Sequence, residues 1–230
     1  MQGNVSLGEN DIKDAYAQKF YVSEDLVNVN LAETFENLDV TAVSATTKFD
    51  AKTGVLNLAD KADDTVYTYE VALRGKTANM KVKLVKANPM NRLYNPNSGE
   101  HFYTADLKEK DALVKLGWND EGYGWVAEKE GKGSPVYRLY NPNSGDHHYT
   151  MDKNEYETLQ VYGWKDEKVG WYSPDAKGAT PAEGHVAVCR QYNPYANGAG
   201  SHNYTTDKAE NDYLCNLGWV YEGIAWTALQ

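Results

Sequence analysis

Positive charge is scarce in this sequence. Of 230 residues, 23 are Lys or Arg and 33 are Asp or Glu, which gives a formal net charge of −10 at pH 7. Proteins bind nucleic acid largely by neutralising its phosphates with basic side chains. The composition therefore excludes nucleic acid as a partner.

Long apolar runs are also missing. No stretch of about 20 apolar residues occurs, so we expect no membrane insertion. The N-terminus, Met1–Val5, is polar and lacks the apolar core of a signal peptide. Alone, this favours the cytoplasm, but a chain cut from a longer protein begins in the same way. We favour the second interpretation: an extracellular or cell-wall associated protein whose signal peptide is removed or lies outside this sequence.

Cysteine is nearly absent, with only Cys189 and Cys215 in the chain. Two cysteines cannot by themselves form a zinc site of the usual four-ligand kind, and we expect no metal or cofactor. A disulfide between them would close a loop of about 26 residues and contribute roughly 3 kcal/mol. Two separate buried thiols are equally compatible with the sequence.

Aromatic residues are unevenly distributed and mark a domain boundary. All six Trp follow residue 117, and 14 of the 18 Tyr follow residue 88. The change in composition near Asn88 predicts one domain over residues 1–88 and a second over 89–230.

Residues 1–88 read as β-structure after an irregular N-terminal segment. Stretches rich in β-branched and alternating residues predict strands at 40–49, 55–58, 65–73 and 80–85. Four to six antiparallel strands in about 70 residues are typical of a small immunoglobulin-like β-sandwich. We expect this domain to act as a spacer.

Residues 89–230 contain one sequence unit three times. The segment Tyr94–Thr104 is nearly repeated at Tyr140–Thr150, and both of its ends recur at Tyr192–Pro194 and His202–Thr205. The repeats span about 90–133, 134–184 and 185–230.

Each repeat predicts strand, turn, strand, short helix and strand. The Asn-Pro-Asn-Ser-Gly words are turn sequences. Each helix begins at an Asp with Glu three residues later, a capping-box arrangement, and ends at a Gly. Apolar pairs at spacing three predict a buried stripe on each helix, namely Leu113 with Leu116, Leu159 with Tyr162 and Leu214 with Leu217.

One such repeat has too little core to be stable alone, whereas three around a common axis can close on themselves. We therefore predict a mainly β protein: an immunoglobulin-like β-sandwich followed by a pseudo-threefold repeat domain with one short helix per repeat. A three-bladed propeller-like form and a β-trefoil-like form both fit. The helix in every repeat favours the propeller.

The repeat words resemble a known family. Arg92-Leu93-Tyr94-Asn95-Pro96-Asn97-Ser98-Gly99, with the later Leu-Gly-Trp and Glu-Gly-x-Gly-Trp words, is similar to an extracellular tandem-repeat family of unknown biochemical function. Its members occur beside cell-wall hydrolases such as lysozyme-like muramidases. The resemblance covers residues 90–230 and implies a secreted accessory module for wall or glycan attachment. The third copy departs from it at Cys189 and Gln191 and in an enlarged turn, Tyr195–Ser201.

Catalysis is not expected from these repeats. Glycosidases need two carboxylates in different environments across a cleft. The recurrent helix-start acids are caps, and Glu121, Glu167 and Glu222 have obvious ion-pair partners in Arg92, Arg138 and Arg190. We predict that these pairs are structural. A three-imidazole metal site from His101, His147 and His202 is the less favoured role for the recurrent histidines.

Glycan binding fits the composition best, because aromatic faces stack on sugar C–H surfaces while polar groups bond the hydroxyls. The candidate ligand-binding residues are His101, Tyr103, His147, Tyr149, His202, Tyr204, Trp125, Trp171 and Trp226. The competing interpretation is that the recurrent Trp and Tyr fill the core. Three weak sites facing one polymer would gain avidity. We therefore predict a non-catalytic module that binds polysaccharide or peptidoglycan; the alternative is a protein-binding adhesin or structural surface module that contacts a host or surface protein.

Overall fold

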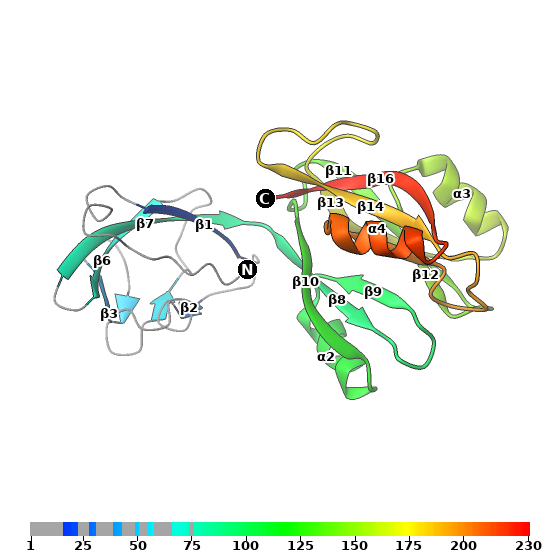
Figure 1. Ribbon diagram of the computed structural model, residues 1–230, viewed down its shortest axis with the longest axis horizontal. Coiled ribbons are helices and arrows are strands. Elements are labelled where there is room, and N and C mark those ends of the chain that lie inside the picture. The colour runs from blue at the N-terminus through cyan, green and yellow to red at the C-terminus, as the bar shows by residue number, and fades with distance from the viewer. Residues whose placement is uncertain are drawn as a thin grey trace. The chain divides into compact units, whose positions relative to one another are not determined.

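The computed structural model describes residues 76–230 without a gap and, before them, the backbone of 16–22, 28–30, 39–42, 49–50, 55–57 and 66–73. The chain divides into two compact units, Met1–Lys86 and Ala87–Gln230. The described elements of the first unit are strands, and strands are also the main elements of the second (Figure 1). The predicted boundary at residue 88 lies close to this division.

The first unit contains two sheets among its described strands. One has the order β1-β7-β6-β3 and the other β2-β5-β4. The strands are β1 (Tyr16–Val22), β2 (Asn28–Asn30), β3 (Asp39–Ala42), β4 (Phe49–Asp50), β5 (Val55–Asn57), β6 (Val66–Leu73) and β7 (Lys76–Lys86).

The purely antiparallel arrangement predicted for this unit is wrong at one strand. β1 runs parallel to β7, with Tyr16 opposite Met80, whereas β6 and β7 form an antiparallel pair. The sequence predicted β6 and β7 but gave no signal for the partner of β1. Residues 43–48 of the predicted strand 40–49 lie outside the described residues.

The second unit repeats strand, strand, helix and strand three times, as predicted. Its elements are β8 (Asn88–Tyr94), β9 (His101–Thr104), α2 (Leu107–Lys115) and β10 (Asn119–Ala127); β11 (Ser134–Asn141), β12 (Asp146–Thr150), α3 (Lys153–Val161) and β13 (Lys165–Ser173); and β14 (His185–Tyr192), β15 (His202–Thr205), α4 (Lys208–Asn216) and β16 (Val220–Leu229). Within each repeat the first strand lies between the other two.

The last strands of the three repeats bring the repeats together. β10 pairs with β16 through Val126 and Leu229, which joins repeats 1 and 3 into one curled six-stranded sheet. Glu128, the residue after β10, forms a bridge with Tyr172 of β13. Ser173 of β13 and Thr227 of β16 share a hydrogen bond of 3.1 Å between their hydroxyls. Each repeat therefore contacts both others, as expected for three repeats around a common axis.

The turns between the first two strands of each repeat adopt the predicted form. The side-chain oxygen of Asn95 accepts from the backbone N–H of Asn97 at 2.9 Å, and Asn141 does the same for Asn143 at 3.0 Å. The enlarged third turn keeps this bond between Asn193 and Tyr195. The repeated words are thus scaffold, since the asparagine bonds its own loop.

The helix ends follow the sequence closely. Asp106, Asp152 and Asp207 are N-caps whose carboxylates accept from backbone N–H groups of the first turn. Each helix ends in a Schellman motif, in which the glycine N–H and the N–H of the following Trp bond back to helix carbonyls. The glycines, Gly117, Gly163 and Gly218, have φ angles of +95°, +93° and +94°. Among the described residues no helix is long and apolar enough to cross a bilayer.

Two finer predictions for the helices are wrong. The buried stripe fails at its second members, because Leu116, Tyr162 and Leu217 are 75%, 75% and 54% exposed. The N–H of each N-cap Asp is taken by a threonine hydroxyl two residues earlier, at 3.0 Å for Asp106 and Thr104, rather than by the glutamate of a capping box. These glutamates are therefore free for another role.

Lys168 occupies a strained backbone position, and replacing it by glycine is expected to stabilise the domain. It has a φ of +68°, where repeats 1 and 3 place Gly122 and Gly223 in the same bulge. The left-handed conformation is unfavourable by about 1–2 kcal/mol for a non-glycine residue, and part of the gain is offset by the entropy of glycine in the unfolded chain. We expect Lys168→Gly to raise the free energy of unfolding by about 0.5–1 kcal/mol in urea titrations. Lys165→Gly, in ordinary strand backbone, should lower it, and a destabilised Lys168→Gly variant would show that the bulge is not strained.

Candidate functional site

Three tyrosines form the centre of the repeat domain. Tyr103, Tyr149 and Tyr204 come from the second strand of each repeat and are at most 1% exposed. Their rings meet edge to face at centroid distances of 5.6, 5.8 and 5.6 Å. Each hydroxyl accepts the backbone N–H of an equivalent tyrosine in another repeat, at 3.1 to 3.3 Å. Burial raises the pKa of all three well above 10, so the hydroxyls stay protonated.

Three tryptophans form a second layer beside the tyrosines. Trp125, Trp171 and Trp226 are 5%, 3% and 2% exposed, with centroid distances of 5.3 to 5.6 Å between them. Each also packs on the tyrosine of its own repeat at 4.8 to 5.0 Å. Their indole Nε1 atoms are buried and have no hydrogen-bond partner among the described residues, so the rings contribute packing.

This burial removes six of the nine candidate glycan contacts. A sugar needs an exposed ring face, and the faces of these tyrosines and tryptophans lie against one another. The sequence raised both roles for them, and the structure places all six in the core. They recur because the common axis requires three equivalent side chains.

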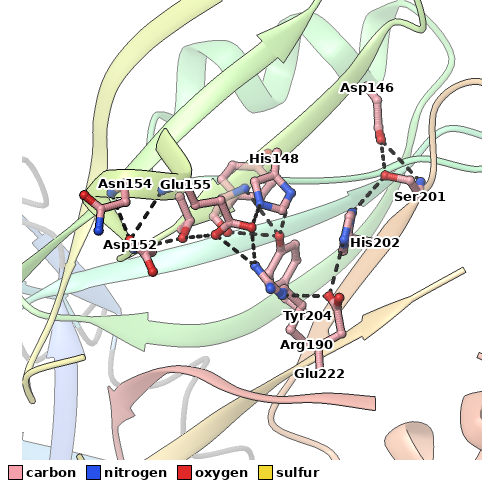
Figure 2. Close-up of polar contacts among 12 residues, drawn as sticks. Asp146, His148, Asp152, Asn154, Glu155, Arg190, Ser201, His202, Tyr204 and Glu222 are labelled. Carbon is pink, nitrogen blue, oxygen red and sulfur yellow. Dashed lines mark hydrogen bonds and ion pairs between the residues drawn. The ribbon is translucent and has the colours of Figure 1, made fainter. Parts of the chain in front are cut away.

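An arginine in each repeat connects two repeats. Arg190 lies between Glu222 of its own repeat, 2.8 Å from Nε to Oε2, and Glu155 of repeat 2, 3.2 Å from Nη1 to Oε1 (Figure 2). Arg138 likewise pairs with Glu167 at 2.9 Å and with Glu109 of repeat 1 at 3.0 Å.

Arg92 connects repeat 1 to repeat 3. It pairs with Glu121 at 2.8 Å and with Glu210 of repeat 3 at 2.6 Å. The pairing of each arginine with the glutamate of its own repeat was predicted. The second glutamate is the one assigned to a capping box, and its contact with another repeat was not predicted.

The recurrent histidines support these ion pairs. His101 and His202 each lie 3.4 Å from the glutamate of their own repeat, and His147 lies 3.6 Å from its equivalent. Their side chains are 16–17% exposed. The axis is filled by the aromatic layers, so the three imidazoles do not converge. Among the described residues, no group of three or more His, Cys, Asp or Glu is placed to hold a metal ion.

Lowered glutamate pKa values make the domain sensitive to acid. A hydrogen bond from His101 lowers the pKa of Glu121, and one from His202 lowers that of Glu222, in both cases against the effect of burial. Burial raises the pKa of Glu155 and Glu210, but bonds from His148 and Arg92 outweigh it, so both are lowered from 4.5.

Since the folded-state values are lowered, this stabilisation is complete above the ordinary pKa of 4.5 and is lost as the pH falls through the folded values. We expect the urea midpoint to decline gently below about pH 6.5, because burial lowers the pKa of His148 and makes its protonation unfavourable in the folded state, and to fall steeply below about pH 4. A midpoint that stayed constant down to pH 2 would contradict the role of these ion pairs.

The two cysteines are free thiols, so the disulfide that the sequence left open is absent; the alternative of two buried thiols is wrong in the burial it predicted. Cys189 Sγ lies 3.8 Å from the hydroxyl of Tyr221. Both thiols are half-buried on repeat 3, away from the axis layers.

A polar groove of about 350 Å³ lies between repeats 1 and 3. Its walls are Arg92, Glu121, Tyr123 and Gly124 of repeat 1 and Tyr204, Thr205, Thr206, Asp207 and Glu210 of repeat 3. Thr206 spans the junction by donating to the carbonyl of Gly124 at 3.4 Å. Tyr123 is 71% exposed and is the one large aromatic residue among the groove walls that is open to solvent.

The sequence prediction missed Tyr123 and Thr206 because it considered only positions that are occupied by the same residue in all three repeats. Tyr123 corresponds to Val169 and Ile224, and Thr206 to Ala105 and Met151. These departures from the repeat were the available signal. Of the predicted site residues only Tyr204 lines the groove, as a buried wall, and none of the three recurrent histidines does.

These features define a β-repeat domain closed around a shared aromatic core. Residues 89–229 match the family described as a domain of unknown function, DUF5648, and the chain belongs to that family. Comparisons with curated proteins and with solved structures found no match.

Proposed function

We propose that the protein is a non-catalytic module that binds cell-wall or other glycan as an accessory to a larger surface protein or wall hydrolase. The groove between repeats 1 and 3 carries this proposal. It combines an exposed aromatic ring, Tyr123, with carboxylate, guanidinium and hydroxyl groups, the side-chain types that hold sugars. The partners would be polysaccharide or peptidoglycan, and the location extracellular or cell-wall associated.

The state of the groove carboxylates supports binding over catalysis. A glycosidase needs one carboxyl group with a raised pKa to protonate the leaving group. Here Glu121 and Glu210 are both held by Arg92 within 2.8 Å, and the pKa of each is lowered. Ionised, paired carboxylates can accept hydrogen bonds from sugar hydroxyls but are poor general acids.

We also propose a role for each unit. The two sheets of the first unit suit an immunoglobulin-like sandwich that acts as a spacer. The short helix in every repeat supports a propeller-like closure over a β-trefoil, because trefoil repeats need no helix. In this arrangement the repeats present their junctions, rather than their aromatic layers, to a ligand.

Retention on insoluble polysaccharides tests the binding proposal. We expect the full chain to be retained on purified peptidoglycan, chitin or chitosan and to lose retention in Tyr123→Ala. Ile224→Ala, at the equivalent position of repeat 3, is the matched control and should bind normally, since Ile224 is exposed but lies outside the groove. If the chain were retained on none of these polysaccharides, the proposal would be overturned.

The alternative, a protein-binding surface module, is favoured by one observation. Each helix exposes an apolar side chain at its C-terminal end: Leu116, Tyr162 and Leu217. The three residues belong to different repeats and so present separate contacts rather than one patch. Retention of a surface protein that is lost in Leu116→Ser and kept in Tyr123→Ala would establish this function instead.

A further inference from the structure

The three junctions between repeats are nearly the same in sequence but differ where a ligand would touch. Of the nine groove positions between repeats 3 and 1, seven are identical at the junction of repeats 1 and 2, where only Val169 and Ala105 replace Tyr123 and Thr206. At the junction of repeats 2 and 3, six are identical, and Ile224, Ala225 and Met151 differ. The ion pairs are thus common to all three junctions, whereas the aromatic platform and the threonine occur at one.

The charge of the groove restricts its ligand. Arg92 is the one cation among the nine lining residues, against the carboxylates of Glu121, Asp207 and Glu210. Arg92 binds Glu210 through two bonds of 2.6 and 2.8 Å. The groove therefore has an excess of negative charge, with its guanidinium already engaged.

Two carboxylate oxygens remain for a ligand. Glu121 makes its contacts with Arg92 and His101 through Oε2, which leaves Oε1 available. Asp207 caps its helix through Oδ1, which accepts from the N–H of Ala209 at 2.7 Å, and this leaves Oδ2. Both residues line the groove beside the exposed ring of Tyr123.

We propose that this junction is the single saccharide site of the protein and that it selects an amino sugar with a free ammonium group, such as a de-N-acetylated hexosamine. The ring of Tyr123 stacks on the C–H face of the sugar, and Glu121 and Asp207 accept from the ammonium. Uronate and phosphate polymers are disfavoured, because like charges meet in the groove. This inference rests on the proposed function and specifies its ligand.

Calorimetric titration at pH 6 with glucosamine hexamer and with N-acetylglucosamine hexamer tests it. We expect one site per chain, at least about tenfold tighter binding of the free amine, and weaker binding as salt rises. Polygalacturonate should not bind. Equal or tighter binding of the N-acetylated hexamer would overturn the amine selectivity and leave glycan binding intact, whereas no binding of any saccharide would overturn the proposed function as well.

Matched variants separate binding from folding. Glu121→Gln and Glu167→Gln each remove the carboxylate that pairs with the arginine of its own repeat. The two variants therefore have the same structural effect at two different junctions. Only Glu121→Gln should weaken binding of the glucosamine hexamer. Equally weakened binding in both variants would overturn the assignment of the site to the junction of repeats 1 and 3. The double variant Ala105→Thr with Val169→Tyr rebuilds the lining at the junction of repeats 1 and 2. It should raise the number of hexamers bound per chain from one to two. A value that stays at one would contradict the role of Tyr123 and Thr206 in determining where the saccharide binds.

Discussion

Trp171→Ala is expected to lower the free energy of unfolding of the repeat domain by about 3–5 kcal/mol, the largest effect of any single substitution considered for the core. Trp171 is 3% exposed and packs on Trp125, Trp226 and Tyr149 at centroid distances of 5.0 to 5.6 Å. Its removal leaves a cavity on the common axis that no single repeat can close. The total free energy of unfolding of a domain is about 5–15 kcal/mol, so urea titration should show that this variant loses a large part of its stability.

Two further variants make this prediction specific. Trp171→Phe should be milder than Trp171→Ala, because the indole Nε1 has no hydrogen-bond acceptor among the described residues that the substitution would remove. Tyr123→Ala, which removes an exposed ring, should change the unfolding free energy by less than about 0.5 kcal/mol. If Trp171→Ala were as stable as Tyr123→Ala, the aromatic layers would not be the core.

Arg138→Met is expected to have the second largest effect, a loss of about 2–3 kcal/mol. The substitution keeps the apolar stem but leaves Glu109 and Glu167 without their shared cation. Unpairing a buried ion pair costs about 3–5 kcal/mol, and we place the effect below that range because these carboxylates are 31% and 29% exposed. The guanidinium also lies 5.2 Å above the ring of Phe102, which adds a contact between repeats 1 and 2.

Lys153→Met is the matched control for a lost ion pair. Lys153 pairs with Glu157 on the surface of α3 at 3.6 Å, and both side chains are more than half exposed. Exposed pairs of this kind contribute about 0.3–0.5 kcal/mol. Equal destabilisation by Lys153→Met and Arg138→Met would show that the arginines do not connect the repeats.

Local features of the repeat domain were predictable from sequence because their causes are local. An Asn beside its own loop, an Asp at a helix start and a Gly at a helix end each act on backbone a few residues away. The ion pair between Arg138 and Glu167 was predictable for a related reason, since both residues recur at fixed positions of one repeat.

Features that depend on the assembly of the repeats were not predictable in the same way. Tyr149 looked like a ligand residue because its role depends on Tyr103 and Tyr204, which meet it only at the common axis. Glu155 looked like a cap because its partner, Arg190, lies 35 residues later in another repeat. The groove was missed because a search for recurring residues passes over Tyr123, which occurs once.

The triplicated side chains belong to the scaffold, and we propose that the ligand binds at one junction. Hydrogen–deuterium exchange of the full chain, with and without glucosamine hexamer, tests this claim most directly. We expect new protection in the segments 121–124 and 204–210 and none in the equivalent segments of the other junctions, 167–170 with 103–109 and 222–225 with 149–155. Equal protection at all three junctions, or protection elsewhere with these two segments unchanged, would contradict it.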